Sequence, residues 1–201
     1  MPQAWDTTTA ARLRPDSPEL EYVRSRWQLG DPVAFTASTL SEIFFGLCRA
    51  TLLTLSPPSR LSDPISPEGS DHPPNRRGLD PAGATLPAEG LNPADAQRGW
   101  LKDQIAAGLI DVLPFEHRAA DIAGALRARI PTPPPAPKRS KGGSKAEGRV
   151  AWMMDLQTSA TVFVHGYDLL SADAHHPLIA KELSALAPST PPLLIEGPPK
   201  F

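Results

Sequence analysis

The chain has 201 residues, a net charge of −2 and a single cysteine, Cys48, which excludes an internal disulfide and a uniformly basic, nucleic-acid-coating protein. Its 25 prolines exceed the roughly ten that average composition would give, so part of the chain is expected to lie outside any core. No apolar run approaches the ~18 residues that span a bilayer, and no secretory leader is recognisable. The composition therefore predicts a soluble, cytoplasmic protein without a membrane partner.

Helical and strand patterns alternate along the chain, separated by glycine and proline turns. The first half of the chain predicts a very short strand at 2–6, a helix at 18–27 capped by Ser17, a strand at 33–36 and a helix at 38–53 capped by Ser38. The middle predicts a helix at 94–107, a strand at 109–115 and a helix at 116–130. The last part predicts a helix at 150–164, a strand at 167–171, a helix at 176–186 and a strand at 192–195. Strands joined by helix-length connections favour a parallel sheet covered on both faces, which is an α/β fold of three layers.

Two low-complexity segments interrupt this pattern within what is expected to be a single domain over residues 1–201. Residues from about 56 to 93 are rich in proline and lack an apolar period, which is typical of a long flexible insert. Residues from about 131 to 148 form a second loop, rich in proline, lysine and glycine. Its basic residues are interpreted either as a solvated linker or as a guide for an RNA backbone.

Four acidic residues, far apart in sequence, stand at the edges of the apolar segments: Asp6, Glu42, Asp155 and Asp173. Asp6 and Asp173 follow predicted strands, and ligands of an open parallel sheet bind outside the carboxyl ends of its strands. Carboxylates brought together there would repel one another, and a hard divalent cation such as Mg²⁺ or Mn²⁺ would relieve that repulsion. Taken singly, each acid is equally consistent with a solvated cap or turn.

Four segments resemble the motifs of PIN-domain nucleases and occur in that family's order: Trp5–Thr8 (WDTT), Thr39–Leu47 (TLSEIFFGL), Leu113–Arg129 and Met154–Asp173 (MDLQTSATVFVHGYDLLSAD). The second of these is the most specific. Together they extend over the chain apart from the two low-complexity segments. The subgroup that the chain resembles most is that of VapC-type toxins of bacterial toxin–antitoxin pairs.

The resemblance implies a PIN-like three-layer α/β/α fold and a Mg²⁺-dependent endoribonuclease, with Mn²⁺ as a possible alternative ion. Each of the four acids matches one of the family's metal-binding, catalytic carboxylates. The implied reaction is hydrolysis of an RNA phosphodiester by metal-activated water. The resemblance also implies a small antitoxin partner and a homodimer. Polar residues that match those orienting carboxylates or phosphate oxygens are Thr7, Thr8 and Ser171.

A second hypothesis is a degenerate PIN fold that binds a partner without cleaving RNA. The short first strand and the long insert favour it, whereas the presence of all four acids favours the enzyme. Thr158 and Ser159 place polar groups on a helix that should be buried. His175 and His176 are expected to form a solvated helix start, although they follow Asp173 closely enough to approach a phosphate.

Overall fold

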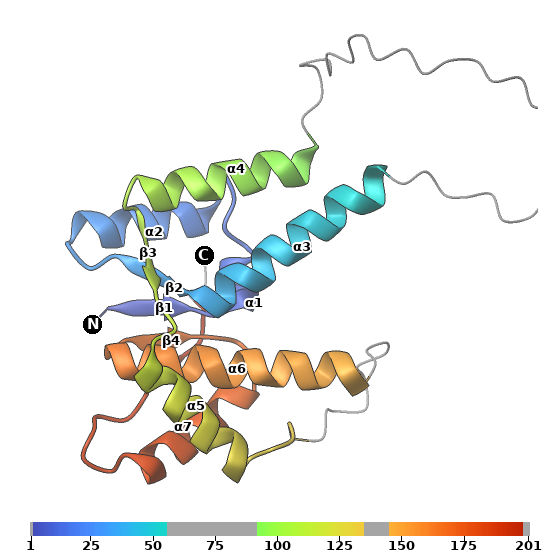
Figure 1. Ribbon diagram of the computed structural model, residues 1–201. Coiled ribbons are helices and arrows are strands. Elements are labelled where there is room, and N and C mark those ends of the chain that lie inside the picture. The colour runs from blue at the N-terminus through green and yellow to red at the C-terminus, as the bar shows by residue number, and fades with distance from the viewer. Residues whose placement is uncertain (1, 56–91, 135–144, 199–201) are drawn as a thin grey trace, which may run out of the picture.

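Five short strands form one sheet in which every pair of neighbours is parallel. The computed structural model describes residues 2–55, 92–134 and 145–198. Within them the strand order is β3-β2-β1-β4-β5. The strands are β1 (Gln3–Trp5), β2 (Val33–Thr36), β3 (Ile110–Leu113), β4 (Asp168–Leu170) and β5 (Ile195–Glu196). Helices cover both faces of the sheet (Figure 1), which confirms the predicted three-layer α/β/α architecture with a central parallel sheet.

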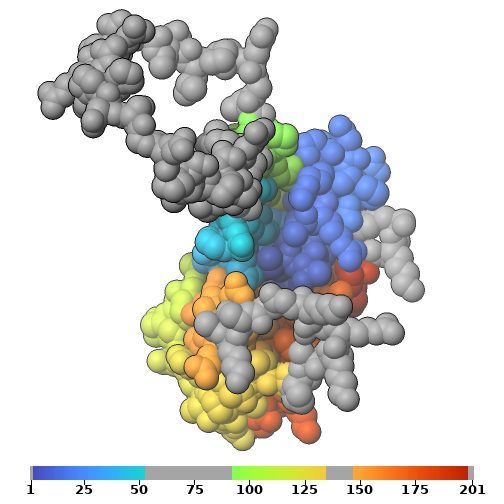
Figure 2. All heavy atoms as spheres, turned by 90° about the vertical axis from the view of Figure 1, so that its right-hand side faces the viewer, coloured from blue at the N-terminus to red at the C-terminus, as the bar shows by residue number. Residues whose placement is uncertain are grey.

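The two helical layers come from different parts of the chain. One layer contains α1 (Thr7–Ala10), α2 (Pro18–Gln28), α3 (Ala37–Leu55) and α4 (Pro93–Ala106). The other contains α5 (His117–Arg129), α6 (Lys145–His165) and α7 (His175–Leu186). Segments coloured blue to cyan and segments coloured yellow to red therefore occupy largely opposite halves of the molecule (Figure 2).

Alternate residues of the central strands belong to different cores, because successive side chains of a strand point to opposite faces. The core shared with α5, α6 and α7 contains Ala4, Ala34 and Leu169. The core shared with the first four helices contains Trp5, Phe35 and Leu170. These six side chains are all buried, so even a strand of three or four residues contributes to both cores. The short first strand is thus held firmly between β2 and β4.

Helix α1 was not predicted, and it changes the setting of Asp6. The helix is a single turn, and Asp6 is its N-cap residue. The backbone N–H of Thr9 donates a hydrogen bond to Asp6 Oδ1 at 2.8 Å. The apolar pattern gives no sign of this turn, because it is too short to have a helical period.

The predicted cap of α3 was wrong. The helix begins at Ala37, and the N–H of Thr39 donates to Thr36 Oγ1 at 3.0 Å, so the last residue of β2 is the cap. The hydroxyl of Ser38 instead donates to Gln157 Oε1 on α6 at 3.3 Å. A threonine serves equally well as a strand residue and as a helix cap, so the strand passes directly into the helix.

Element boundaries near the prolines also differ from the prediction. Most of the predicted insert at 56–93 and of the loop at 131–148 lies outside the described residues, but Lys145–Gly148 form the start of α6. The last strand is Ile195–Glu196 rather than 192–195, since Pro191 and Pro192 have no N–H to donate to a sheet. Within the described ranges, no helix is both long and apolar enough to cross a membrane.

Candidate metal centre at the carboxyl edge of the sheet

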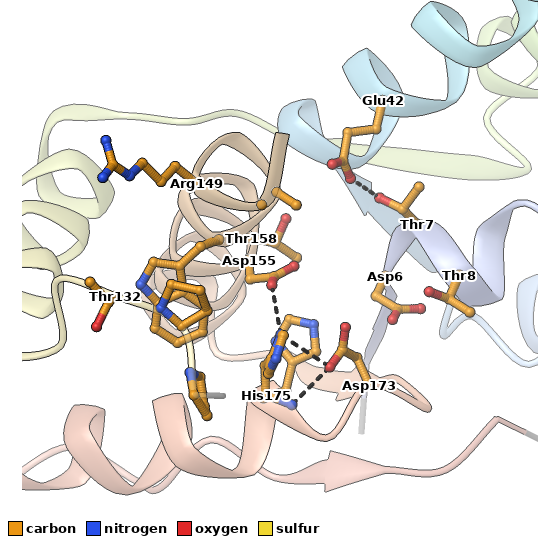
Figure 3. Close-up of a pocket in the computed structure, with 16 residues that line it drawn as sticks. Asp6, Thr7, Thr8, Glu42, Thr132, Arg149, Asp155, Thr158, Asp173 and His175 are labelled. Atoms are coloured by element: carbon orange, nitrogen blue, oxygen red, sulfur yellow. Dashed lines mark hydrogen bonds and ion pairs between the residues drawn. The ribbon is translucent and has the colours of Figure 1, made fainter. Parts of the chain in front are cut away.

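All four sequence-predicted acids line one cavity of about 840 Å³ (Figure 3). Asp6 directly follows β1, and Asp173 follows β4 by three residues. Glu42 lies in α3 and Asp155 lies in the middle of α6. Strands β1 and β4 are parallel neighbours, with Trp5 paired to Leu170. Their carboxyl ends therefore deliver Asp6 and the Asp173 loop to the same edge of the sheet.

Asp6 is buried, with 4% of its surface exposed, and both of its oxygens accept hydrogen bonds. Oδ1 accepts from the N–H of Thr9, and Oδ2 accepts from the hydroxyl of Ser171 at 2.5 Å. Thr9 is held in turn by donating its hydroxyl hydrogen to the carbonyl of Leu170 at 3.2 Å. These hydrogen bonds satisfy both oxygens of the buried side chain and fix its orientation at the edge of the cavity.

Glu42 reaches the cavity from α3. Its Oε2 accepts a hydrogen bond from the hydroxyl of Thr7, the first residue of α1. Thr8, the next residue, also lines the cavity and is exposed. Two of the three predicted orienting residues, Thr7 and Ser171, thus contact acids directly, whereas Thr8 lines the cavity without contacting one of them.

Asp155, Asp173 and His175 form the tightest group at the site. Their ligand atoms all lie within 4.8 Å of one another, and among the described residues this is the group whose spacing could hold a metal ion. His175 Nδ1 is 3.3 Å from Asp155 Oδ2 and 3.3 Å from Asp173 Oδ1. Asp6 and Glu42 line the same cavity but stand outside this group, each bound to a hydroxyl.

The environment of Asp155 makes its negative charge costly. The pKa of Asp155 is raised from the ordinary 3.8 to about 7. Burial is the main cause, the negative charge of Asp173 adds to it, and the hydrogen bond and charge of His175 act in the opposite direction. A bound cation would offset this cost, because its positive charge stabilises the ionised form of the carboxyl group.

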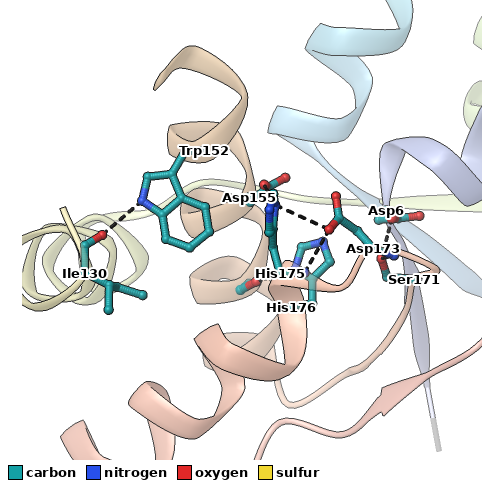
Figure 4. A network of polar contacts seen from close by, with 9 residues as sticks. Asp6, Ile130, Trp152, Asp155, Ser171, Asp173, His175 and His176 are labelled. Carbon is teal, nitrogen blue, oxygen red and sulfur yellow. Dashed lines mark hydrogen bonds and ion pairs between the residues drawn. The ribbon is translucent and has the colours of Figure 1, made fainter. Parts of the chain in front are cut away.

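Aromatic packing and a neighbouring histidine fix this group in place (Figure 4). The edge of the Trp152 ring meets His175, with ring centroids 5.5 Å apart and planes at 86°. Trp152 is held by a hydrogen bond from its Nε1 to the carbonyl of Ile130 at 3.0 Å. His176 is buried, and its Nδ1 is 2.9 Å from the hydroxyl of Ser159.

The polar residues of α6 that departed from the family pattern have partners. Thr158 Oγ1 is 3.3 Å from Thr36 Oγ1, and the Thr36 hydroxyl is also 3.0 Å from that of Thr39. Ser159 bonds to His176 as described above. Buried hydroxyls with hydrogen-bond partners are tolerated in a core, so these residues do not loosen α6.

His175 and His176 were both expected at a solvated helix start. For His176 this was wrong, because its side chain is buried. His175 does begin α7 and is partly exposed, but its ring lies between two carboxylates from different elements. The local signal was its spacing from Asp173, an Asp-Ala-His sequence in which the N–H of His175 donates to Asp173 Oδ1 at 2.8 Å. The contact with Asp155 depends on how α6 packs against α7, which no local pattern reveals.

The far half of the cavity has a different character. It is lined by Thr132, Pro133, Pro134, Arg149 and Trp152. Arg149 is exposed and lies six residues before Asp155 on α6. No acid among the described residues forms an ion pair with it. The cavity therefore runs from a group of carboxylates to a positive charge about 9 Å along the helix axis.

The residues present fit a divalent cation. Two carboxylates with accessible oxygens and one imidazole nitrogen face a common point, and two further acids stand at its margin. Zinc in structural sites prefers four ligands rich in Cys and His, whereas an oxygen-rich set suits Mg²⁺ or Mn²⁺. Side-chain exposures of 21% for Asp155 and 35% for Asp173 leave a path for the ion.

No family model and no curated protein matches the chain. Among solved structures, it is similar to VapBC2 from Rickettsia felis bound to a promoter DNA fragment, with 10% identity, 98% of each chain covered and a TM-score of 0.48. DNA-bound VapBC from Salmonella typhimurium is 13% identical, with 98% of each chain covered and a TM-score of 0.48. FitAcB from Neisseria gonorrhoeae is 14% identical, with 98% of this chain and 97% of that chain covered and a TM-score of 0.46.

Proposed function

We propose that this protein is a metal-dependent endoribonuclease that hydrolyses RNA phosphodiesters and acts as the toxin of a toxin–antitoxin pair. The observation that carries the proposal is the meeting of four acids, from four separate segments, at one open cavity. Burial and the nearby charge of Asp173 raise the pKa of Asp155 to about 7, which gives a physical reason for a cation there. The motifs in which the acids stand supply the reaction class.

In this proposal Asp155 and Asp173 hold the cation, and Asp6 and Glu42 stand at its margin. Mg²⁺ is the ion that the oxygen ligands favour, with Mn²⁺ as the alternative. The bound ion would lower the pKa of an attacking water and stabilise the charge that develops on the phosphate. Asp6 is held in one orientation by its hydrogen bonds, so it can position a water molecule beside the ion.

The second half of the cavity is proposed to bind the RNA strand. Arg149 offers a guanidinium, which can form two parallel hydrogen bonds with a phosphate. Thr8 can donate a hydroxyl to another phosphate oxygen on the opposite wall. A strand that reaches from Arg149 toward Asp155 would place one phosphate against the acids and a neighbouring phosphate against the guanidinium.

The protein partners are proposed on the sequence resemblance alone. A small antitoxin would bind the free toxin and block the cavity, and a homodimer is the expected assembly. The alternative function is a PIN-like binding module without nuclease activity. The hydrogen bonds that already occupy both oxygens of Asp6 in this structure favour that alternative, because they leave fewer lone pairs for a metal.

Cleavage of a mixed RNA substrate separates the two functions. Purified full-length protein is incubated with RNA and with single-stranded DNA of the same sequence, in Mg²⁺ and in EDTA. Asp155→Asn is compared with Asp103→Asn, an exposed acid on α4. We expect RNA cleavage in Mg²⁺, none in EDTA, and a loss of at least about 100-fold in Asp155→Asn alone.

Two results would contradict the proposal. Cleavage that persists in EDTA would remove the metal mechanism. RNA binding without cleavage, by folded protein free of antitoxin and supplied with either Mg²⁺ or Mn²⁺, would support the binding module.

A further inference from the structure

His175 brings a nitrogen atom into a site that the sequence motifs describe as made of carboxylates. Its Nδ1 faces Asp155 on α6 and Asp173 on the loop after β4 (Figure 4). The ring is 30% exposed, so it lies at the wall of the cavity and is reachable from solvent. Two explanations are open for this placement: an ion pair with the acids, or a ligand position beside them.

The two distances favour a ligand position. Nδ1 carries at most one hydrogen, and it lies 3.3 Å from an oxygen of each acid: the contact with Asp155 Oδ2 is a long hydrogen bond, and the contact with Asp173 Oδ1 is an ion pair. One N–H cannot point at both oxygens, and 3.3 Å is longer than the roughly 2.7–3.2 Å of a good N–H···O bond. Neighbouring ligands around an ion with bonds of about 2.1 Å are separated by about 3.0 Å in octahedral geometry and about 3.4 Å in tetrahedral geometry.

The imidazole is also held in this orientation by contacts that need no ion. The backbone N–H of His175 donates a hydrogen bond to Asp173 Oδ1 at 2.8 Å, which ties the start of α7 to the acid. The edge-on contact with Trp152 fixes the ring plane, and Trp152 is itself anchored to the carbonyl of Ile130. A donor atom whose direction is already set loses little conformational entropy when it binds an ion.

We infer that His175 Nδ1 is a ligand of the cation held by Asp155 and Asp173, and that this nitrogen makes the site favour a first-row transition ion such as Mn²⁺ over Mg²⁺. Mg²⁺ binds oxygen ligands and retains its waters, whereas imidazole is a good ligand for transition ions. The inference rests on the metal site of the proposed function, but it does not require RNA cleavage.

Nitrogen ligation is measured directly on the full-length protein without RNA. Metal-free protein is loaded with substoichiometric Mn²⁺, and pulsed electron paramagnetic resonance records coupling to nitrogen nuclei bonded to the ion. His175→Asn is the informative variant, because its amide oxygen replaces Nδ1 at a similar position and can still bind a cation. His117→Asn, an exposed histidine at the start of α5, is the matched control.

We expect nitrogen coupling in the unmodified protein and in His117→Asn, and its loss in His175→Asn with Mn²⁺ still bound. Calorimetric titrations of Mn²⁺ and Mg²⁺ provide the second measurement. The ratio of the two dissociation constants should favour Mn²⁺ and fall by at least about tenfold in His175→Asn, with no change in His117→Asn.

The inference is overturned if bound Mn²⁺ shows no nitrogen coupling, or if the coupling survives in His175→Asn, which would point to His176 instead. Failure to bind Mn²⁺ at all would overturn the inference and the metal mechanism together. Nitrogen-coupled Mn²⁺ in a protein that does not cleave RNA would support the inference and contradict only the nuclease.

Discussion

Ser171, the first residue after β4, donates its hydroxyl hydrogen to Oδ2 of Asp6, the first residue after β1. The same hydroxyl oxygen accepts the N–H of Asp173 at 2.9 Å. One small side chain therefore sets the positions of two acids that come from loops far apart in sequence. The paired register of Trp5 and Leu170 is what brings the loops together.

Replacing Ser171 by alanine should weaken both the fold and the metal site. The change leaves Oδ2 of buried Asp6 and the N–H of Asp173 without this partner. We expect a loss of about 1–3 kcal/mol in the free energy of unfolding, measured by urea denaturation of the metal-free protein. Affinity for Mn²⁺ should fall by roughly 10–100-fold, because the loss frees a carboxylate that lines the site.

Ser171→Thr is the matched variant, since it keeps the hydroxyl. Ser171→Thr should lose less affinity for Mn²⁺ than Ser171→Ala loses. Equal effects of the two substitutions would show that side-chain volume, and not the hydrogen bonds, sets the site.

Asp155 should make the metal-free protein less stable as the pH rises. Its folded-state pKa of about 7 lies above the ordinary 3.8, so the folded protein binds the extra proton between these values. The contribution of the protonated group is complete below about pH 4 and is lost as the pH rises through about 7. At pH 8, Asp155→Asn should raise the melting temperature by about 2–8 °C, corresponding to about 1–2 kcal/mol.

With a saturating divalent cation, the unmodified protein should instead have a higher melting temperature than Asp155→Asn. The ion stabilises the ionised acid in the unmodified protein and has a weaker site in Asp155→Asn. Thermal melts at pH 5 and pH 8, with EDTA and with Mn²⁺, test both statements. A variant that is less stable than the unmodified protein in EDTA at pH 8 would contradict the assignment of a costly buried charge.

The sheet and most helices could be predicted because their signals are local. Apolar runs such as Val33–Thr36 and the Ser17-Pro18 helix start depend on neighbouring residues alone. The convergence of Asp6 and Asp173 could also be predicted, because parallel strands end at a common edge. Their metal-binding role remains a prediction.

The role of His175 and the cap of α3 were not predictable in the same way. His175 meets Asp155 only through the packing of α7 against α6, which is a contact between elements rather than a pattern within one. Thr36 serves both β2 and α3, so the expected boundary at Ser38 fell two residues late. Both misjudgements concern residues whose partners are chosen by tertiary structure.

Arg149 should affect RNA binding more than the chemical step. Its guanidinium lies at the end of the cavity away from the acids, so Arg149→Ala should raise KM by about 5–20-fold and leave kcat within about twofold. The slope of log K against log salt concentration should become less steep by about 0.7, which is the value for one phosphate contact on a single strand.

The control for charge alone is Arg118→Ala, an exposed arginine on α5 outside the cavity. It should leave KM and the salt slope unchanged. If both variants weaken binding equally, RNA responds to net charge and not to a phosphate position beside Arg149.

His176 should give the protein a second, opposite dependence on pH. The pKa of His176 is lowered mainly by burial, with Asp6 and Asp173 acting in the opposite direction. Its folded-state pKa therefore lies below the ordinary 6.5, and its contribution to stability is present above pH 6.5 and lost as the pH falls from there. The effect is best measured in Asp155→Asn, where the opposing titration has been removed.

In that background, urea denaturation should show stability falling between pH 6.5 and pH 5. Adding His176→Asn, which keeps a polar group near Ser159 but does not titrate, should flatten this part of the profile. Ser159→Ala should instead lower stability by about 1–3 kcal/mol at pH 7.5, because it removes the hydroxyl partner of the buried ring. A profile that stays steep in the His176→Asn background would assign the acid-side loss to another group, since the folded chain would then still exclude a proton that the unfolded chain accepts.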